Sequence, residues 1–144
     1  MSKYTDTAME RRSVMTPDGR PAYNCCQAVV TVFARDLGYD EESARKCATF
    51  FRGGMQMGSV CGAVTGGLMA LGLAGVTDRG ITEEYFSKLR GCHDGTLNCA
   101  ELLAANAQRG CEKKPFCNAL IRECVEYVEE ALRAQGKLPD ENGG

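Results

Sequence analysis

Nine cysteines are the residues of this chain that are best suited to chemistry, and they are spread over most of its length. They are Cys25, Cys26, Cys47, Cys61, Cys92, Cys99, Cys111, Cys117 and Cys124. None forms a Cys-x-x-Cys pair, which argues against a thioredoxin motif, a zinc ribbon and a bacterial ferredoxin pattern. The N-terminus lacks the apolar run of a signal peptide, so we expect a cytoplasmic chain with reduced thiols. Many cysteines in that setting indicate metal, cluster or redox chemistry.

Cys61 lies in an uncharged, glycine-rich stretch, GSVCGAVTGGLMALGLAG. We expect a buried helix from Cys61 to about Leu73, which places this thiol where the amides of a helix N-terminus stabilise a thiolate. Gly62 and Gly66 lie one helical turn apart. Without side chains they allow a neighbouring backbone, or a bulky inorganic group, to approach Cys61 closely. We therefore expect both glycines to lie at the binding site.

The elements that must position the thiols are predicted to be helices. The chain is rich in residues that favour helix, and no segment has the pattern of a strand. We expect an all-α fold, a compact bundle of about five to six helices around a central glycine-rich buried helix. Residues 1–144 form one domain in this prediction, with an N-terminal extension over 1–20 and a flexible tail over 136–144. Residues 53–77 carry no charge, but their glycines and Gln56 argue against a membrane span.

Most of the cysteines lie on the apolar stripe of their own predicted helix, so thiols from different helices can converge inside the bundle. Buried cysteine is also a common packing residue, and Cys47 is the best candidate for that role. Cys26 lies one position off its helix face and is either next to the site or filler. We expect His93 to lie in an exposed turn and not to bind metal.

The sequence lacks the motifs of several other kinds of binding site and active site. It contains no phosphate-binding loop, dinucleotide-binding fingerprint or nucleophile elbow, and its carboxylates form no acid–base pair. A net charge of -2 gives no reason to expect a nucleic acid or a membrane as partner. We expect a redox partner protein, whose identity the sequence does not indicate.

Four blocks of sequence are similar to one known family. CGAVTG, Cys61 to Gly66, resembles the CGAxxG motif of the C-GCAxxG-C-C family of redox-active proteins, and YNCCQAV, LNCAELL and CVEYV resemble its flanking blocks. This resemblance runs from roughly Ala22 to Ala131. It implies a redox protein, with an iron–sulfur cluster as the expected cofactor, and carries over a functional set. That set is Cys25, Cys61, Cys99 and Cys124.

Three functions remain open at this point. We favour an iron–sulfur electron carrier, because four thiolates suffice to hold a cluster and glycines make room for it. The alternative is a thiol–disulfide redox protein, with Cys61 as attacking thiol and Cys25 or another thiol as resolving partner. The third is a structural zinc site in an interaction module. Cys26, Cys92, Cys111 and Cys117 exceed the family pattern, and Cys117 or Cys111 can take the place of Cys124.

Overall fold

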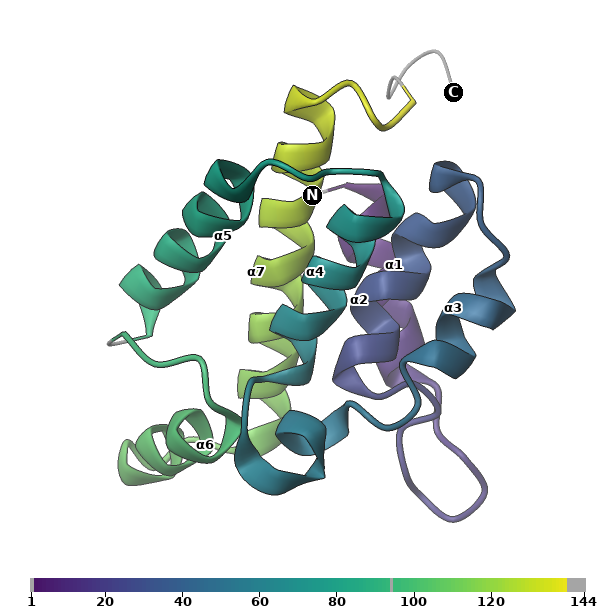
Figure 1. The fold of residues 1–144 in the computed structure, drawn as a ribbon. Coiled ribbons are helices and arrows are strands. Elements are labelled where there is room, and N and C mark those ends of the chain that lie inside the picture. Colours follow the sequence, from purple (N-terminus) through teal and green to yellow (C-terminus); the bar gives the residue numbers. More distant parts are fainter. Residues whose placement is uncertain (1, 94, 140–144) are drawn as a thin grey trace.

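The fold is all-α, as the composition predicts. A computed structural model describes residues 2–93 and 95–139, in which no β-strand occurs. The described part of the chain contains seven α-helices and two short helical turns (Figure 1). They are α1 (Lys3–Ser13), α2 (Cys25–Ala34), η1 (Arg35–Leu37), α3 (Glu41–Cys47), η2 (Gly54–Gly58), α4 (Gly62–Leu73), α5 (Arg79–Cys92), α6 (Cys99–Gln108) and α7 (Lys113–Ala134).

The glycine-rich helix α4 packs against α2 and α7. Small residues make its approach to α2 possible, because a Cβ atom added at Gly66 would lie 2.6 Å from the backbone oxygen of Cys26. On its other side Gly67 makes way for the hydroxyl of Tyr85. Tyr85 is buried and donates a hydrogen bond of 3.1 Å to the carbonyl oxygen of Val64. The helix is therefore shaped for contact with two neighbours at once.

Helix α1 belongs to the same hydrophobic core and packs against α2 and α7. Tyr4 stacks on Phe33 with ring centroids 4.8 Å apart, and Ala8 is fully buried. The Tyr4 hydroxyl donates to Asp36, 2.6 Å away. Much of the stretch before residue 20 thus contributes to the core. Residues 140–144 of the expected tail lie outside the described residues.

The start of α2 is fixed by side-chain hydrogen bonds. Asn24 and Gln27 form a reciprocal capping box, which satisfies amides that the first helical turn leaves unpaired. The Asn24 amide also donates to the carbonyl oxygens of Ala48 and Thr49, at 3.1 and 3.0 Å. These bonds tie the first turn of α2, which carries Cys25, to the chain that leaves α3.

No helix within residues 2–93 and 95–139 combines the length and the apolar character needed to cross a bilayer. The uncharged stretch around α4 instead packs within the bundle. Most of its side chains are buried or half-buried, and Gly72 is exposed.

Replacement of Gly66 by alanine tests the packing of α4 on α2. We expect Gly66→Ala to lower the free energy of unfolding by about 1–3 kcal/mol, because the new methyl group overlaps backbone that cannot move aside freely. Gly72→Ala is the matched control, since nothing lies within 4 Å of a Cβ atom at that position. It should leave stability unchanged or raise it by up to about 1 kcal/mol. Urea denaturation measures both; equal effects would contradict the packing argument.

Candidate functional site

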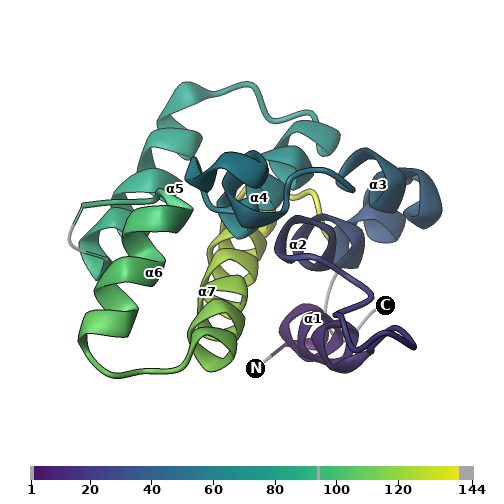
Figure 2. The same ribbon diagram turned by 90° about the horizontal axis from the view of Figure 1, so that it is seen from below.

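Three cysteines occupy the starts of three helices. Cys25 is the first residue of α2, Cys99 is the first residue of α6, and Cys61 is the residue that caps α4. Figure 2 shows α6, α4 and α2 next to one another, with the segment that precedes α4 in front of it. Helix N-termini carry unpaired amides and a partial positive charge. A helix start taken alone therefore favours the thiolate form of the cysteine that occupies it, or a negatively charged group that thiolates hold.

Two backbone hydrogen bonds hold the starts of α4 and α6 together. The amide of Cys61 donates to the carbonyl oxygen of Leu97 at 2.8 Å, and the amide of Cys99 donates to that of Ser59 at 2.7 Å. They flank an antiparallel bridge between Val60 and Asn98. Cys61 and Cys99 are consequently fixed relative to each other by backbone, even though 37 residues separate them in the chain.

The two glycines predicted to lie at the site both face α2. A Cβ atom added at Gly62 would lie 2.7 Å from the sulfur of Cys25 and 2.7 Å from the backbone oxygen of Phe51. At Gly66 the nearest atoms belong to Cys26 and Val29. The sequence suggested that these glycines make room either for a neighbouring backbone or for an inorganic group. The structure shows a neighbouring backbone close to both of them. At Gly62 it brings the sulfur of Cys25 against the start of α4.

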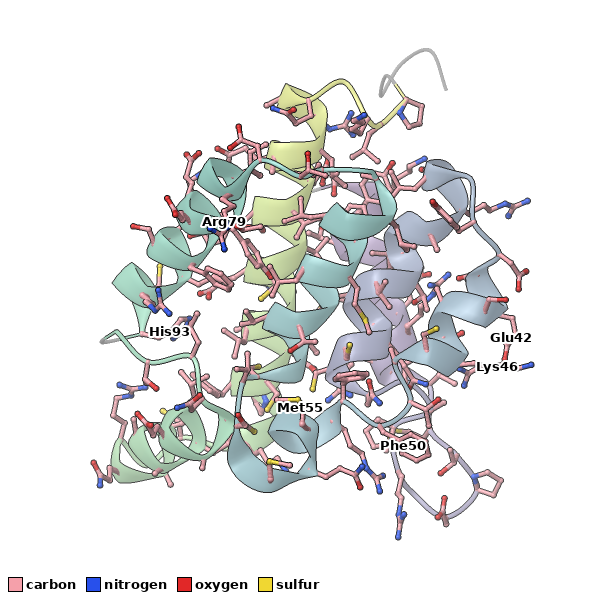
Figure 3. All side chains as sticks on the ribbon, viewed as in Figure 1. Glu42, Lys46, Phe50, Met55, Arg79 and His93 are labelled. Atoms are coloured by element: carbon pink, nitrogen blue, oxygen red, sulfur yellow. The ribbon has the colours of Figure 1, made fainter. Side chains whose placement is uncertain are left out.

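An open cleft of about 820 Å³ lies over these helix starts. Three thiols line it, those of Cys25, Cys99 and Cys117, and all three are half-buried. Figure 3 shows yellow sulfur atoms gathered at the lower end of the bundle, near the labelled Met55. Cys117 comes from the second turn of α7, so the thiols that line the cleft come from three helices, α2, α6 and α7; Cys61 is not part of the lining.

Two cations act on Cys117. Arg12 and Lys113 lower the pKa of Cys117, but burial and the nearby Cys25 outweigh them and raise it. Arg12 also joins separate parts of the site: its guanidinium donates to Asn118 at 3.2 Å and to the carbonyl oxygen of Tyr23 at 2.8 Å. It thereby ties the segment before Cys25 to the helix that carries Cys117.

The backbone amides of Ala63 and Val64, in the first turn of α4, lower the pKa of Cys61, as a helix start is expected to do. Burial has the larger effect and, together with Cys25, raises the pKa of Cys61 to about 12. The expectation of a thiolate favoured at this position is thus wrong for the metal-free protein, because only 7% of the residue is exposed.

Cys124 lies deeper than the other thiols of the functional set. It is fully buried and does not line the cleft. Burial raises its pKa, and a hydrogen bond with Tyr85 opposes that effect. Cys61 and Cys25 also raise the pKa of Cys124, so the three sulfurs interact electrostatically. Cys117 therefore lines the cleft, whereas Cys124 lies in the core.

The remaining cysteines lie away from the cleft. Cys26 is buried in a second apolar cluster, with its sulfur 3.6 Å from that of Met69, and burial raises its pKa to about 12. Cys92 and Cys111 are exposed. Cys47 is exposed too, so its prediction as a packing residue is wrong: α3 is short and its buried position is Ala44.

His93 also differs from its prediction as an exposed turn residue. Only 10% of its side chain is exposed, and Nε2 lies 2.7 Å from a carboxylate oxygen of Glu123. Its ring meets that of Phe116 edge-on.

The site has two further residues that the sequence analysis did not identify, Arg12 and Lys113. Lys113 precedes Cys117 by one helical turn, a spacing that signals a shared face, whereas the sequence holds no comparable signal for Arg12.

No three His, Cys, Asp or Glu side chains within the described ranges lie close enough together to hold a single metal ion. The four thiols of an iron–sulfur cluster are divided among two or four iron atoms, so they need not all converge on one point. The donor set is compatible with that requirement, because thiols from separate segments line one cleft.

A family model described as "Putative redox-active protein (C_GCAxxG_C_C)" matches residues 23–131. The chain belongs to this family. The match includes all nine cysteines and every helix from α2 to α6, together with most of α7. The family description indicates that the chain is a redox-active protein. The searches of the curated proteins and of the solved structures found no match to the chain.

Thiol alkylation tests the burial of the site in metal-free, reduced protein. At about pH 8, iodoacetamide should modify the exposed Cys47, Cys92 and Cys111 first and the buried Cys26, Cys61 and Cys124 last, since alkylation needs an accessible thiolate. Peptide mass spectrometry over time gives the rate at each cysteine. Alkylation of Cys61 as fast as that of Cys47 would contradict both its burial and its raised pKa. Denatured protein, in which all nine should react alike, is the control.

Proposed function

We propose that this chain is a redox protein whose clustered thiols hold an iron–sulfur cluster for electron transfer. The observation that carries the proposal is that Cys25, Cys61 and Cys99 lie at three helix N-termini and act on one another electrostatically, with Cys25 and Cys99 in the same cleft as Cys117. An iron–sulfur cluster takes up and releases single electrons at a potential that hydrogen bonds and burial adjust. The family description as redox-active agrees with this function.

The electrostatics of the thiols support metal binding. Burial and neighbouring cysteines raise the pKa of Cys61, Cys99, Cys117 and Cys124. Thiols packed in this way stay protonated when no cation accompanies them, because each thiolate would repel the next. Metal coordination removes that obstacle, since a coordinating thiol is deprotonated outright. Raised values are therefore compatible with ligands and unfavourable for an attacking thiol.

Cys25, Cys61, Cys99 and Cys117 are the ligand set that we propose. The amides of Ala63 and Val64 favour the thiolate form of Cys61. Arg12 and Lys113 act on Cys117 and offset negative charge on the thiolates. Cys124 would then serve as a buried neighbour, and its hydrogen bond with Tyr85 would adjust the surroundings of the site without coordination.

A thiol–disulfide function is the second candidate, and the open cleft is the observation that favours it. Cys25, Cys99 and Cys117 line the same solvent-filled space, which gives a disulfide substrate access to them. In this case Cys25 replaces Cys61 as the attacking thiol, because Cys61 is buried with a raised pKa. Cys99 or Cys117 would be its resolving partner.

Anaerobic reconstitution with iron and sulfide is the direct test. We expect the protein to bind both, with the broad visible absorption of a cluster, and to be reduced and reoxidised reversibly. Cys25→Ala, Cys61→Ala and Cys99→Ala should each lose most of the bound iron. Cys47→Ala and Cys111→Ala are matched controls at exposed positions and should keep it. A colourless, iron-free wild-type protein would refute the cluster; a stable oxidised form two hydrogens lighter would then identify the thiol–disulfide function.

A second pair of variants separates the two possible fourth ligands. We expect Cys117→Ser to lower the bound iron and to change the absorption spectrum, whereas Cys124→Ser should retain the cluster with a shifted reduction potential. Iron analysis and a redox titration measure the two effects. Circular dichroism serves as the folding control, because Cys124 is fully buried. The reverse pattern would return the fourth ligand to Cys124.

A further inference from the structure

Exposed apolar side chains occur in two segments of the chain that also contribute residues to the thiol cleft. Within the described residues, six large apolar side chains are exposed: Val14, Met15, Tyr39, Phe50, Met55 and Met57. All but Tyr39 belong to two segments, 14–21 and 50–58, and both segments contribute residues to the lining of the cleft. Figure 3 labels Phe50 and Met55 together at the lower end of the molecule. Such concentration on one side of a protein marks an interaction surface.

The lining of the cleft is positively charged, although the whole chain carries a net charge of -2. Arg12, Arg20, Arg52 and Lys113 line the cleft, against the single carboxylate of Asp18. Asp18 lies 3.5 Å from Arg20 and so offsets that cation. Within the described part of the chain no carboxylate forms an ion pair with the other three. The local excess of positive charge attracts an acidic partner.

An unusual backbone presents the methionines. Gly53, Gly54, Met55 and Gln56 are four consecutive residues with positive φ, between 58° and 64°. For Met55 and Gln56 the left-handed conformation costs roughly 1–2 kcal/mol per residue. Strained backbone of this kind persists where the surroundings enforce it and is concentrated at functional sites. Here it precedes Met57, which is 77% exposed at the cleft.

We propose that the mouth of the cleft, formed by segments 14–21 and 50–58 with Lys113, docks a small acidic electron-carrier protein. Methionine, aromatic and arginine side chains are enriched at protein interfaces, and surrounding cations select a partner of opposite charge. The partner's role as electron carrier rests on the function proposed above. One electron passes between the carrier and the thiol-bound centre of this chain; what one loses the other gains, and no bond is made or broken.

The cleft favours a protein over a lipid surface. Its thiols line a hollow to which segments 14–21 and 50–58, with their exposed apolar side chains, also contribute. A protruding protein surface can enter such a hollow and a flat bilayer cannot. A small anion could occupy the cations of the cleft, but it would leave the exposed Phe50 and Met57 uncovered. Contact with both the exposed apolar side chains of segments 14–21 and 50–58 and the cations of the cleft therefore requires a large partner.

The test is calorimetric titration of the reconstituted protein with a small acidic [2Fe–2S] ferredoxin, compared with a basic cytochrome c. We expect binding to the ferredoxin that weakens as salt rises, and none to the cytochrome. The double variant Arg52→Glu and Lys113→Glu should weaken binding at least about tenfold. Its control, Arg79→Glu and Lys137→Glu, changes the net charge equally at exposed positions outside the cleft and should have less than about a twofold effect. Phe50→Ser with Met57→Ser should weaken binding without altering its salt dependence.

Three outcomes would overturn the docking surface. One is a ferredoxin that fails to bind, or binds the charge-reversed variant as tightly as wild type. Another is equal binding of cytochrome c. The last is binding to vesicles of phosphatidylglycerol, or to citrate, with the same dependence on Arg52 and Lys113 and no binding of ferredoxin. The titration is repeated on protein that has taken up no iron. Charge-dependent docking there would show that the surface binds its partner without the cluster, so that a failure of reconstitution would refute the cluster and leave the surface in place.

Discussion

The close approach of α4 to α2 is the contact on which the site depends. Gly62 and Gly66 have no side chains, so the backbone of α2 comes near enough for the sulfur of Cys25 to lie against the start of α4. Any larger residue at these positions would separate the two helices and, with them, Cys25 from Cys61. The core formed by α2, α4 and α7 is thereby coupled to the geometry of the thiols.

Two opposing effects act on the sulfur of Cys61. The amides of Ala63 and Val64 favour its thiolate, as a helix start does, while burial disfavours any charge there. Burial has the larger effect in the metal-free protein. The amides are nevertheless fixed by α4 and need no rearrangement when a cation binds, so the arrangement suits a thiolate that exists only with metal beside it.

The sequence predicted the class of fold and most of the helices, because helix formers, caps and turn residues act locally. Through its motif blocks it also indicated one functional set, Cys25, Cys61, Cys99 and Cys124, of which Cys124 lies fully buried and away from the cleft. The sequence alone did not predict the contacts between segments that lie far apart in the chain. The pairing of Ser59 with Cys99, the guanidinium of Arg12 at Asn118, and the exposure of Cys47 all depend on how separate helices pack. The left-handed run at Gly53 was equally hidden, since Met55 and Gln56 rarely adopt that conformation.

The thiols of the cleft come from helices that begin far apart in the chain, and backbone bonds such as that from Cys61 to Leu97 hold two of them in place. In a zinc knuckle, ligands that are close in sequence bind the ion before the rest of the chain has folded, and the bound ion then drives folding. Here the loops that separate the sulfurs must close first, at an entropic cost that only the apolar core repays. For the iron–sulfur cluster proposed above, the chain would therefore fold before the metal is loaded.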